Sequence, residues 1–222
     1  MKYFNIISSF FVATLLISNT VATKLFSLGP FVFTGAIFVF PISYIFGDIL
    51  TEVYGYTNSR KIIWTGFFCL IFMSLVYWLV GLLPSAPGWE NQQAYIAILG
   101  VVPRITFASI VAFWAGEFAN SFVLAKIKII TSGKRLWMRT ISSTVVGQGI
   151  DTTLFVFIGF FGLIPNSILF LVIISGYLFK VTYEVIATPI TYKAVAFLKK
   201  KEGIDCYDYK TNFNPFKLNN NS

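Results

Sequence analysis

The sequence contains no histidine and only two cysteines, and just 12% of its residues are charged. Without histidine the chain lacks the usual general base, which weighs against hydrolases built on a Ser/His or Cys/His pair. Cys69 falls in an apolar segment and Cys206 in a charged one, so the two support neither a disulfide framework nor a Cys/His metal site. So few charges cannot cover the surface of a soluble domain of 222 residues.

The chain is instead rich in apolar residues: 56% of it is hydrophobic and the mean hydropathy is +0.75. A helix needs about 20 mostly apolar residues to cross roughly 30 Å of hydrocarbon. Six blocks meet this requirement, over residues 4–26, 31–50, 62–83, 104–130, 140–163 and 167–198. The sequence therefore predicts an all-α membrane protein. We expect a bundle of six transmembrane helices in residues 1–203 and a polar cytoplasmic tail in residues 204–222.

The net charge of +8 indicates how the helices are oriented. If both termini are cytoplasmic, the outer side receives only Lys24 and Arg104, which lie near helix ends. The cytoplasmic side then receives Lys2, Arg60, Lys61, Lys126, Lys128, Lys134, Arg135, Arg139, Lys199, Lys200, Lys201, Lys210 and Lys217. We therefore predict an N-in and C-in protein of a bacterial inner membrane, in contact with the lipid bilayer. We expect no nucleic-acid partner, because no separate basic domain exists to bind phosphates.

Several ionisable residues lie inside the apolar blocks, where each costs at least about 2.5 to 3.5 kcal/mol. They fall at helical spacing with other polar residues, so each pair shares a helix face. The pairs are Asp48 with Glu52, Glu117 with Asn120, Gln148 with Asp151, and Lys180 with Glu184. The cheapest arrangement turns all four faces toward a common interior. Such a polar cavity at the midplane is what a transporter of a small solute needs.

Two interpretations of these residues stay open at this point. Lys180 and Glu184 can pair with each other, or Lys180 with Asp151, and simply hold helices together. However, pairing leaves more acids than bases in the interior, so either some carboxylates are protonated or a ligand supplies donors. Aromatic residues near these positions could stack on a planar solute, namely Trp114, Phe118, Tyr177 and Tyr183. Small residues at Ala108, Ala112 and Gly116 favour close helix approach.

Four segments carry a more specific signal. They are SNTVATK at 18–24, FPISYIFGDILTEVYG at 40–55, GEFANS at 116–121 and GQGIDT at 147–152. These segments resemble the queuosine precursor transporter family, which belongs to the vitamin uptake transporter group, and the similarity extends through residues 180–184. The resemblance implies uptake of 7-deazaguanine bases such as preQ0 or preQ1, which cells salvage to make queuosine in tRNA.

A deazaguanine is planar and presents N–H donors along its pairing edge, so a carboxylate can accept two hydrogen bonds from it. Under this hypothesis Glu117 or Asp151 accepts from that edge, and Asn120 and Gln148 complete the contact. The candidate solute-binding residues also include Lys180, Glu184 and Asn19. Asp48 and Glu52 are assigned to a cytoplasmic gate or to coupling. We expect no metal and no cofactor.

Other functions remain open from sequence alone. The same fold could carry another vitamin-like or nucleobase solute. A membrane-embedded enzyme could use Glu117 and Asp151 as an acid/base pair, but the sequence supplies neither a metal cluster nor an activated nucleophile, so we predict no enzyme. A structural membrane subunit would pair its interior charges. Proton coupling, facilitated transport and the oligomeric state stay undecided. No phosphate-binding Gly-rich loop is present for ATP hydrolysis by this chain.

Overall fold

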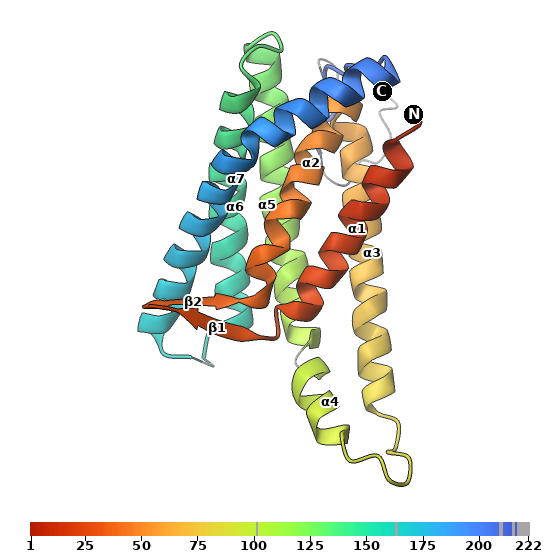
Figure 1. Cartoon of the computed structure of the whole chain (residues 1–222), viewed down its shortest axis with the longest axis vertical. Coiled ribbons are helices and arrows are strands. Elements are labelled where there is room, and N and C mark those ends of the chain that lie inside the picture. The colour runs from red at the N-terminus through yellow and green to blue at the C-terminus, as the bar shows by residue number, and fades with distance from the viewer. Residues whose placement is uncertain (101, 163, 209–210, 215, 217–222) are drawn as a thin grey trace.

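The computed structural model describes residues 1–100, 102–162, 164–208, 211–214 and 216. Its helices are α1 (Phe4–Val21), α2 (Phe40–Tyr54), α3 (Tyr56–Gly81), α4 (Gln92–Leu99), α5 (Val102–Ile130), α6 (Leu136–Phe160) and α7 (Asn166–Glu202). Between α1 and α2 lie β1 (Leu25–Leu28), β2 (Phe31–Thr34) and the 3-10 helix η1 (Gly35–Phe38). All helices except the short α4 lie side by side along the long axis in Figure 1.

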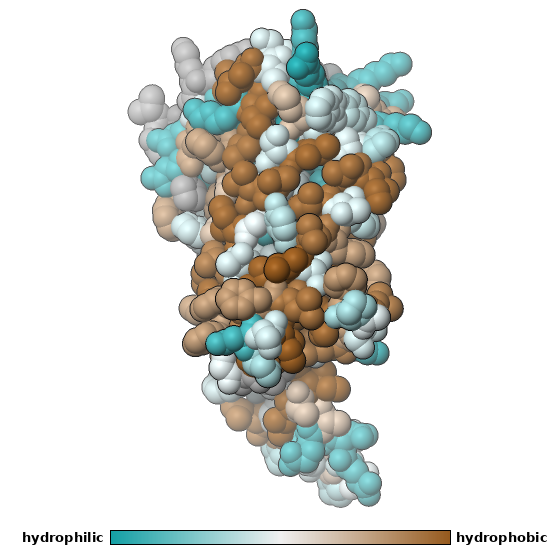
Figure 2. Space-filling model, turned by 90° about the vertical axis from the view of Figure 1, so that its left-hand side faces the viewer, coloured by the Kyte–Doolittle hydropathy of each residue, from teal (hydrophilic) through white to brown (hydrophobic). Residues whose placement is uncertain are grey.

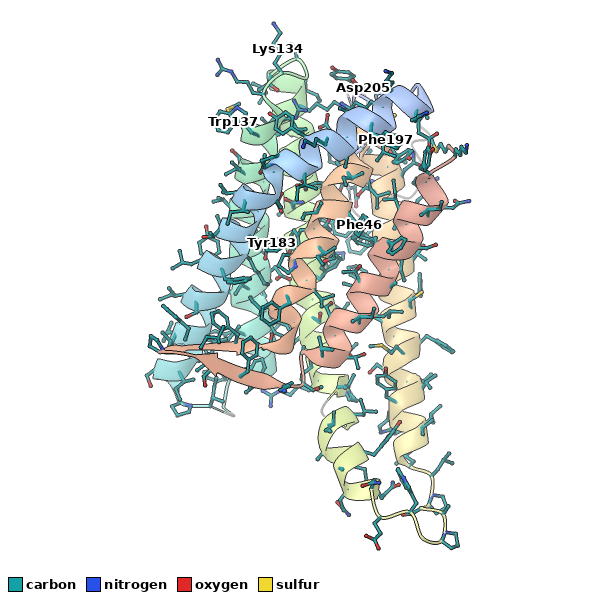
Figure 3. All side chains as sticks on the ribbon, viewed as in Figure 1. Phe46, Lys134, Trp137, Tyr183, Phe197 and Asp205 are labelled. Atoms are coloured by element: carbon teal, nitrogen blue, oxygen red, sulfur yellow. The ribbon has the colours of Figure 1, made fainter. Side chains whose placement is uncertain are left out.

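The two ends of the bundle differ in what they carry. Both chain termini lie at the upper end in Figure 1, and the β1–β2 hairpin lies toward the opposite end. We call them the terminal end, with Met1 and Glu202, and the hairpin end, with residues 25–34. Lys134, in the loop between α5 and α6, lies at the terminal end (Figure 3). The predicted positions Lys210 and Lys217 lie outside the described residues.

Five segments are long and apolar enough to cross a membrane. They are α1, α3, the stretch Gln92–Ile130, α6 and α7. Large apolar side chains on their outer faces are widely exposed, for example Phe72 at 68% and Ile186 at 71%. Figure 2 shows apolar residues over the middle of one face, with hydrophilic residues toward both ends. Apolar patches of this extent are what a protein surrounded by lipid presents.

The prediction of one continuous helix over residues 31–50 is wrong. β1 and β2 form an antiparallel hairpin in which Leu25 faces Thr34, and the helix proper begins only at Phe40. The hairpin turns at Gly29, whose φ of +58° suits a residue without a side chain. α2 has 15 residues and is therefore about 22 Å long, too short to cross the hydrocarbon core alone. The first block likewise ends at Val21 rather than at residue 26.

Close contact between α5 and α6 positions the polar interior. The backbones approach so closely that a Cβ atom added at Gly116 would lie 2.8 Å from the carbonyl oxygen of Gly147. A Cβ at Gly147 would lie 2.9 Å from the carbonyl oxygen of Gly116. Ala108 and Ala112 are also fully buried. Small residues allow this approach, and it brings the polar residues of α5 beside those of α6.

The described part of the C-terminal segment folds back over the terminal end. The Asp208 carboxylate accepts hydrogen bonds from the backbone N–H of Tyr56 at 3.2 and 3.3 Å. Arg60 is fully buried and donates to the carbonyl oxygens of Asn212 and Asn214 at 2.8 and 2.5 Å. Residues 204–208 and 211–214 therefore cover the start of α3.

Candidate functional site

All nine residues that the sequence predicts as site residues are buried, with at most 9% of their surface exposed. Asn19 comes from α1, and Asp48 and Glu52 come from α2. The remaining residues come from the last three helices of the bundle: Glu117 and Asn120 from α5, Gln148 and Asp151 from α6, and Lys180 and Glu184 from α7. We use the term interior acids for Asp48, Glu117, Asp151 and Glu184.

Lys180 resolves the pairing that the sequence left open. Its Nζ lies 3.0 Å from Oδ2 of Asp151 and donates to Oγ1 of Thr152 at 3.2 Å. The same ammonium group lies 4.6 Å from the ring centroid of Phe40, within the range of a cation–π contact. Lys180 therefore pairs with the neighbouring helix α6 and makes no ion pair with Glu184 on its own helix.

Asp48 and Asn120 form a second contact across the interior. The Asn120 side chain donates to Oδ1 of Asp48 at 2.8 Å. The other oxygens of both side chains have no hydrogen-bond partner among the described residues, and the same is true of Gln148 Oε1 and Glu184 Oε1. Each buried acceptor without a hydrogen bond costs about 1 to 3 kcal/mol of folding free energy. The unpaired oxygens of the interior therefore reduce the stability of the folded protein.

Glu117 differs from the other interior acids in its hydrogen bonding. It is fully buried, and neither carboxylate oxygen has a hydrogen-bond partner within the described part of the chain. Ser121 lies one turn along α5, but its hydroxyl contacts Oγ1 of Thr51 at 3.2 Å. The carboxylate lies directly against Gly47 of α2, where any side chain would collide with it. The glycine thus makes room for an acid that has no hydrogen-bond partner among the side chains and backbone described.

The interior therefore holds four acids and one base. Lys180 is the only ammonium group found among the described interior side chains, and it is already bonded to Asp151 and Thr152. The unpaired oxygens of the other acids need hydrogen-bond donors or protons. A bound solute or water can supply the donors, and protonation of the carboxylates can supply the protons. The arrangement is suited to receive a donor-rich molecule.

A pocket leads from the hairpin end to Asp151, one of the four interior acids. It contains about 580 Å³ of space free of protein atoms, part of it open to the outside. Its polar wall includes Asn19, Asp151 and Lys180. Aromatic rings from three elements form much of its apolar wall, namely Phe33, Phe40 and Phe155.

The aromatic residues proposed from the sequence lie elsewhere. Trp114, Phe118, Tyr177 and Tyr183 are not part of the pocket wall. Trp114 instead makes an edge-to-face contact with Phe118, with ring centroids 5.7 Å apart, and Tyr183 stacks on Phe179 at 6.5 Å. Nearness in sequence to a buried charge did not identify the rings that face the pocket, because neighbours in a helix point in different directions.

Glu52 lies in a different environment from the interior acids. Its Oε1 is 2.8 Å from Arg139, 2.6 Å from Lys199 and 3.5 Å from Lys128. Asp205 joins the same cluster, at 2.8 Å from Lys128 and 2.9 Å from Lys199. We call these five residues the terminal-end network. Figure 3 shows Asp205 near the end of α7, at the terminal end.

The terminal-end network is strongly paired. Burial alone would raise the pKa of the Asp205 carboxyl, but its bonds to Lys128 and Lys199 outweigh burial and hold this pKa below its usual value. Lys128 also donates to the backbone oxygens of Glu52 and Cys206. The network ties α2, α5, α6 and α7 to the C-terminal segment, and thus joins the helices at this end.

Sequence reasoning missed several residues of the site. Tyr44 is fully buried and its hydroxyl has no hydrogen-bond partner among the described residues. Its position one turn before Asp48 was an available signal, since both lie on one face of α2. Phe33 carried no such signal, because its strand was predicted as helix.

Comparison with known proteins identifies the family of this chain. Residues 34–194 match the family described as "Putative vitamin uptake transporter". The chain belongs to the vitamin uptake transporter family. The matched range contains every predicted site residue except Asn19. The resemblance found from the sequence is therefore confirmed, and this vitamin uptake transporter is a multi-pass membrane protein and not an enzyme.

Two relatives carry more specific names. This chain is 33% identical over 156 residues to the "Probable queuosine precursor transporter" of Bacillus subtilis (strain 168), which covers 70% of this chain and 68% of the relative. It is 26% identical over 154 residues to the "Queuosine precursor transporter" of Escherichia coli (strain K12), which covers 69% and 67%. No solved structure matches the chain significantly.

Proposed function

We propose that this vitamin uptake transporter imports queuosine precursors, 7-deazaguanine bases such as preQ0 or preQ1, for tRNA modification. The names of both relatives support the solute class. The observation that carries the proposal is the fully buried Glu117 carboxylate, whose two oxygens have no hydrogen-bond partner among the described residues. A transporter for a base with two adjacent donors needs such an acceptor.

The chemistry of the solute fits the interior. The ring N–H and the exocyclic amino group of a 7-deazaguanine lie side by side, so one carboxylate can accept both in a bidentate contact. Glu117 is the first candidate for this contact and Asp151 the second. The amides of Asn120 and Gln148 lie on the helices that carry these acids and can complete the polar contacts. Phe40 and the other pocket rings offer apolar surfaces for the faces of the base.

The orientation we propose is N-in and C-in within a bacterial inner membrane. The terminal end carries nearly all the lysines and arginines, and basic residues collect on the cytoplasmic side of membrane proteins. In this orientation the pocket faces outward and the terminal-end network closes the cytoplasmic side. Release inward then requires separation of Glu52 from its bases, while Asp48 lies between the pocket and this gate. Such alternation around a fixed site is the common transporter plan.

The decisive experiment is uptake of radiolabelled preQ1 and preQ0 into vesicles that contain the purified protein, with and without a pH gradient. We expect saturable uptake by the wild type and a loss of about 100-fold or more in Glu117→Ala/Asp151→Ala, because two hydrogen bonds to charged groups are worth about 3 to 6 kcal/mol together. Glu90→Ala, in the exposed loop before α4, is the matched control and retains uptake. Unchanged uptake by the double variant in correctly inserted protein would refute the site.

The other candidate solutes are separated by competition. Unlabelled vitamins and nucleobases without the paired donors are added to the same vesicles at increasing concentration. We expect 7-deazaguanine bases to compete and bases without the adjacent donors to fail. Stronger competition by another solute would assign the transporter to that solute and leave the family unchanged.

A further inference from the structure

Some hydrogen-bond donors of the interior are already used, whereas other buried hydroxyl groups, those of Tyr44, Thr144 and Ser175, have no partner among the described residues. Lys180 donates to Asp151 and Thr152, and the Asn120 amide donates to Asp48. The Tyr44 hydroxyl is fully buried and has no partner among the described residues. A phenol hydroxyl is both donor and acceptor, so this group can serve an acceptor that the acids would repel.

The packing around Tyr44 holds its hydroxyl in place. The ring lies against Phe40 and Phe113, with centroid distances of 5.5 and 6.1 Å. The hydroxyl oxygen reaches the contact of α5 with α6, since a Cβ atom added at Gly116 would lie 3.0 Å from it. The side chain is fully buried, so the hydroxyl does not contact solvent in this arrangement.

The electrostatic surroundings make the unbonded hydroxyl unusual. Asp151, Glu117 and Asp48 all act on it electrostatically, so three acceptors lie near a donor that bonds to none of them. A hydroxyl that packing did not constrain would donate to a carboxylate, because hydrogen bonds to charged acceptors are stronger than those to neutral acceptors. Packing instead holds this donor at the contact of α5 with α6, where it has no partner among the described residues.

The chemistry of the solute then gives this donor a use. In a guanine-type base, the carbonyl oxygen lies directly beside the ring N–H that a carboxylate would bind. A second carboxylate opposite that oxygen would repel it, so recognition of the complete edge needs a donor next to the acid. We propose that the Tyr44 hydroxyl donates to the carbonyl oxygen of the bound base and selects bases that carry this acceptor. This inference rests on the proposed function.

The test compares two ligands that differ in one acceptor. Purified protein in lipid nanodiscs is titrated with 7-deazaguanine and with its 6-thio analogue, in which a poorly accepting sulfur replaces the oxygen while the N–H donors remain. We expect the wild type to prefer the oxo base by about tenfold, the size of one good hydrogen bond. Tyr44→Phe keeps the ring and removes the hydroxyl, so we expect its preference to fall below about twofold.

The matched control is Tyr54→Phe, another buried tyrosine of α2, whose hydroxyl donates to Glu202 at the terminal end. We expect it to keep the tenfold preference. A wild type that binds both ligands equally, or a Tyr44→Phe variant that keeps the full preference, would overturn the inference. If Tyr44→Phe does not fold, equal binding of both ligands by the wild type would still overturn the inference. If the wild type binds no deazaguanine, the proposed function fails, and this inference falls with it.

Discussion

The interior acids and the terminal-end network are both buried clusters of charge, but they are partnered in opposite ways. Glu52 contacts three bases, whereas the similarly buried Glu117 contacts none among the described residues. Within α2, four residues separate Asp48, which bonds to an amide, from Glu52, which bonds to an arginine and a lysine. The charges of the terminal-end network therefore hold the helices together, whereas the unpaired interior acids are available to bind a solute.

The energetics of the two regions differ accordingly. A buried ion pair contributes little net stability, yet removal of one partner is costly because the others are left uncompensated. An unpaired buried acid already carries its penalty in the folded protein, so its removal relieves a cost. Substitutions in the two regions should therefore separate stability from solute binding.

The largest expected effect is that of Glu52→Gln on stability. The change leaves Arg139 and Lys199 beside an uncharged amide, and a broken buried pair costs about 3 to 5 kcal/mol. Thermal unfolding of the purified protein in detergent should show a clearly lower midpoint than the wild type. Glu117→Gln is the matched control, with the same chemical change in a site without bases. Equal loss of stability in both variants would abolish the distinction between the two regions.

A smaller effect is expected for Gly47→Ala. The added methyl group collides with the Glu117 carboxylate, which must move, while the helix backbones stay in place. We expect solute affinity to fall at least about tenfold, with a stability loss at the lower end of the roughly 1 to 3 kcal/mol for overpacking. Binding titrations and thermal unfolding measure the two quantities. Gly149→Ala, where the nearest atom is 3.7 Å away, should change neither.

The smallest effect is expected for Asp205→Asn. The Asp205 side chain is 43% exposed, so solvent weakens its pairs with Lys128 and Lys199, and such pairs are worth up to about 1 kcal/mol. Because its folded pKa is lowered, the carboxylate stabilises the protein at pH values above the unfolded pKa of about 4. This contribution is lost as the pH falls through the folded pKa. The wild type and the variant should thus differ slightly at pH 7 and converge in acid, and a difference that grows on acidification would contradict this assignment.

Helical spacing in the sequence predicted polar residues that the structure buries, but it also placed Glu52 with the interior acids, whereas Glu52 lies among the bases of the terminal-end network. Hydropathy could not separate the β1–β2 hairpin from the helix that follows, since a short apolar run suits either structure. The partner of Lys180 depended on how α6 and α7 meet, which spacing within one helix does not determine. The bases around Glu52 were predicted only as cytoplasmic charges, because a lysine at a helix end has the same sequence signal whether it is exposed or paired.

The central claim is that the unpaired Glu117 carboxylate binds the solute. Thermal unfolding with and without preQ0 tests it most directly, because a ligand at 100 times its Kd stabilises the folded protein by about 2.7 kcal/mol. We predict a raised midpoint for the wild type and for Asp205→Asn, and no change for Glu117→Gln. A full shift in Glu117→Gln, or none in the wild type, would contradict the claim.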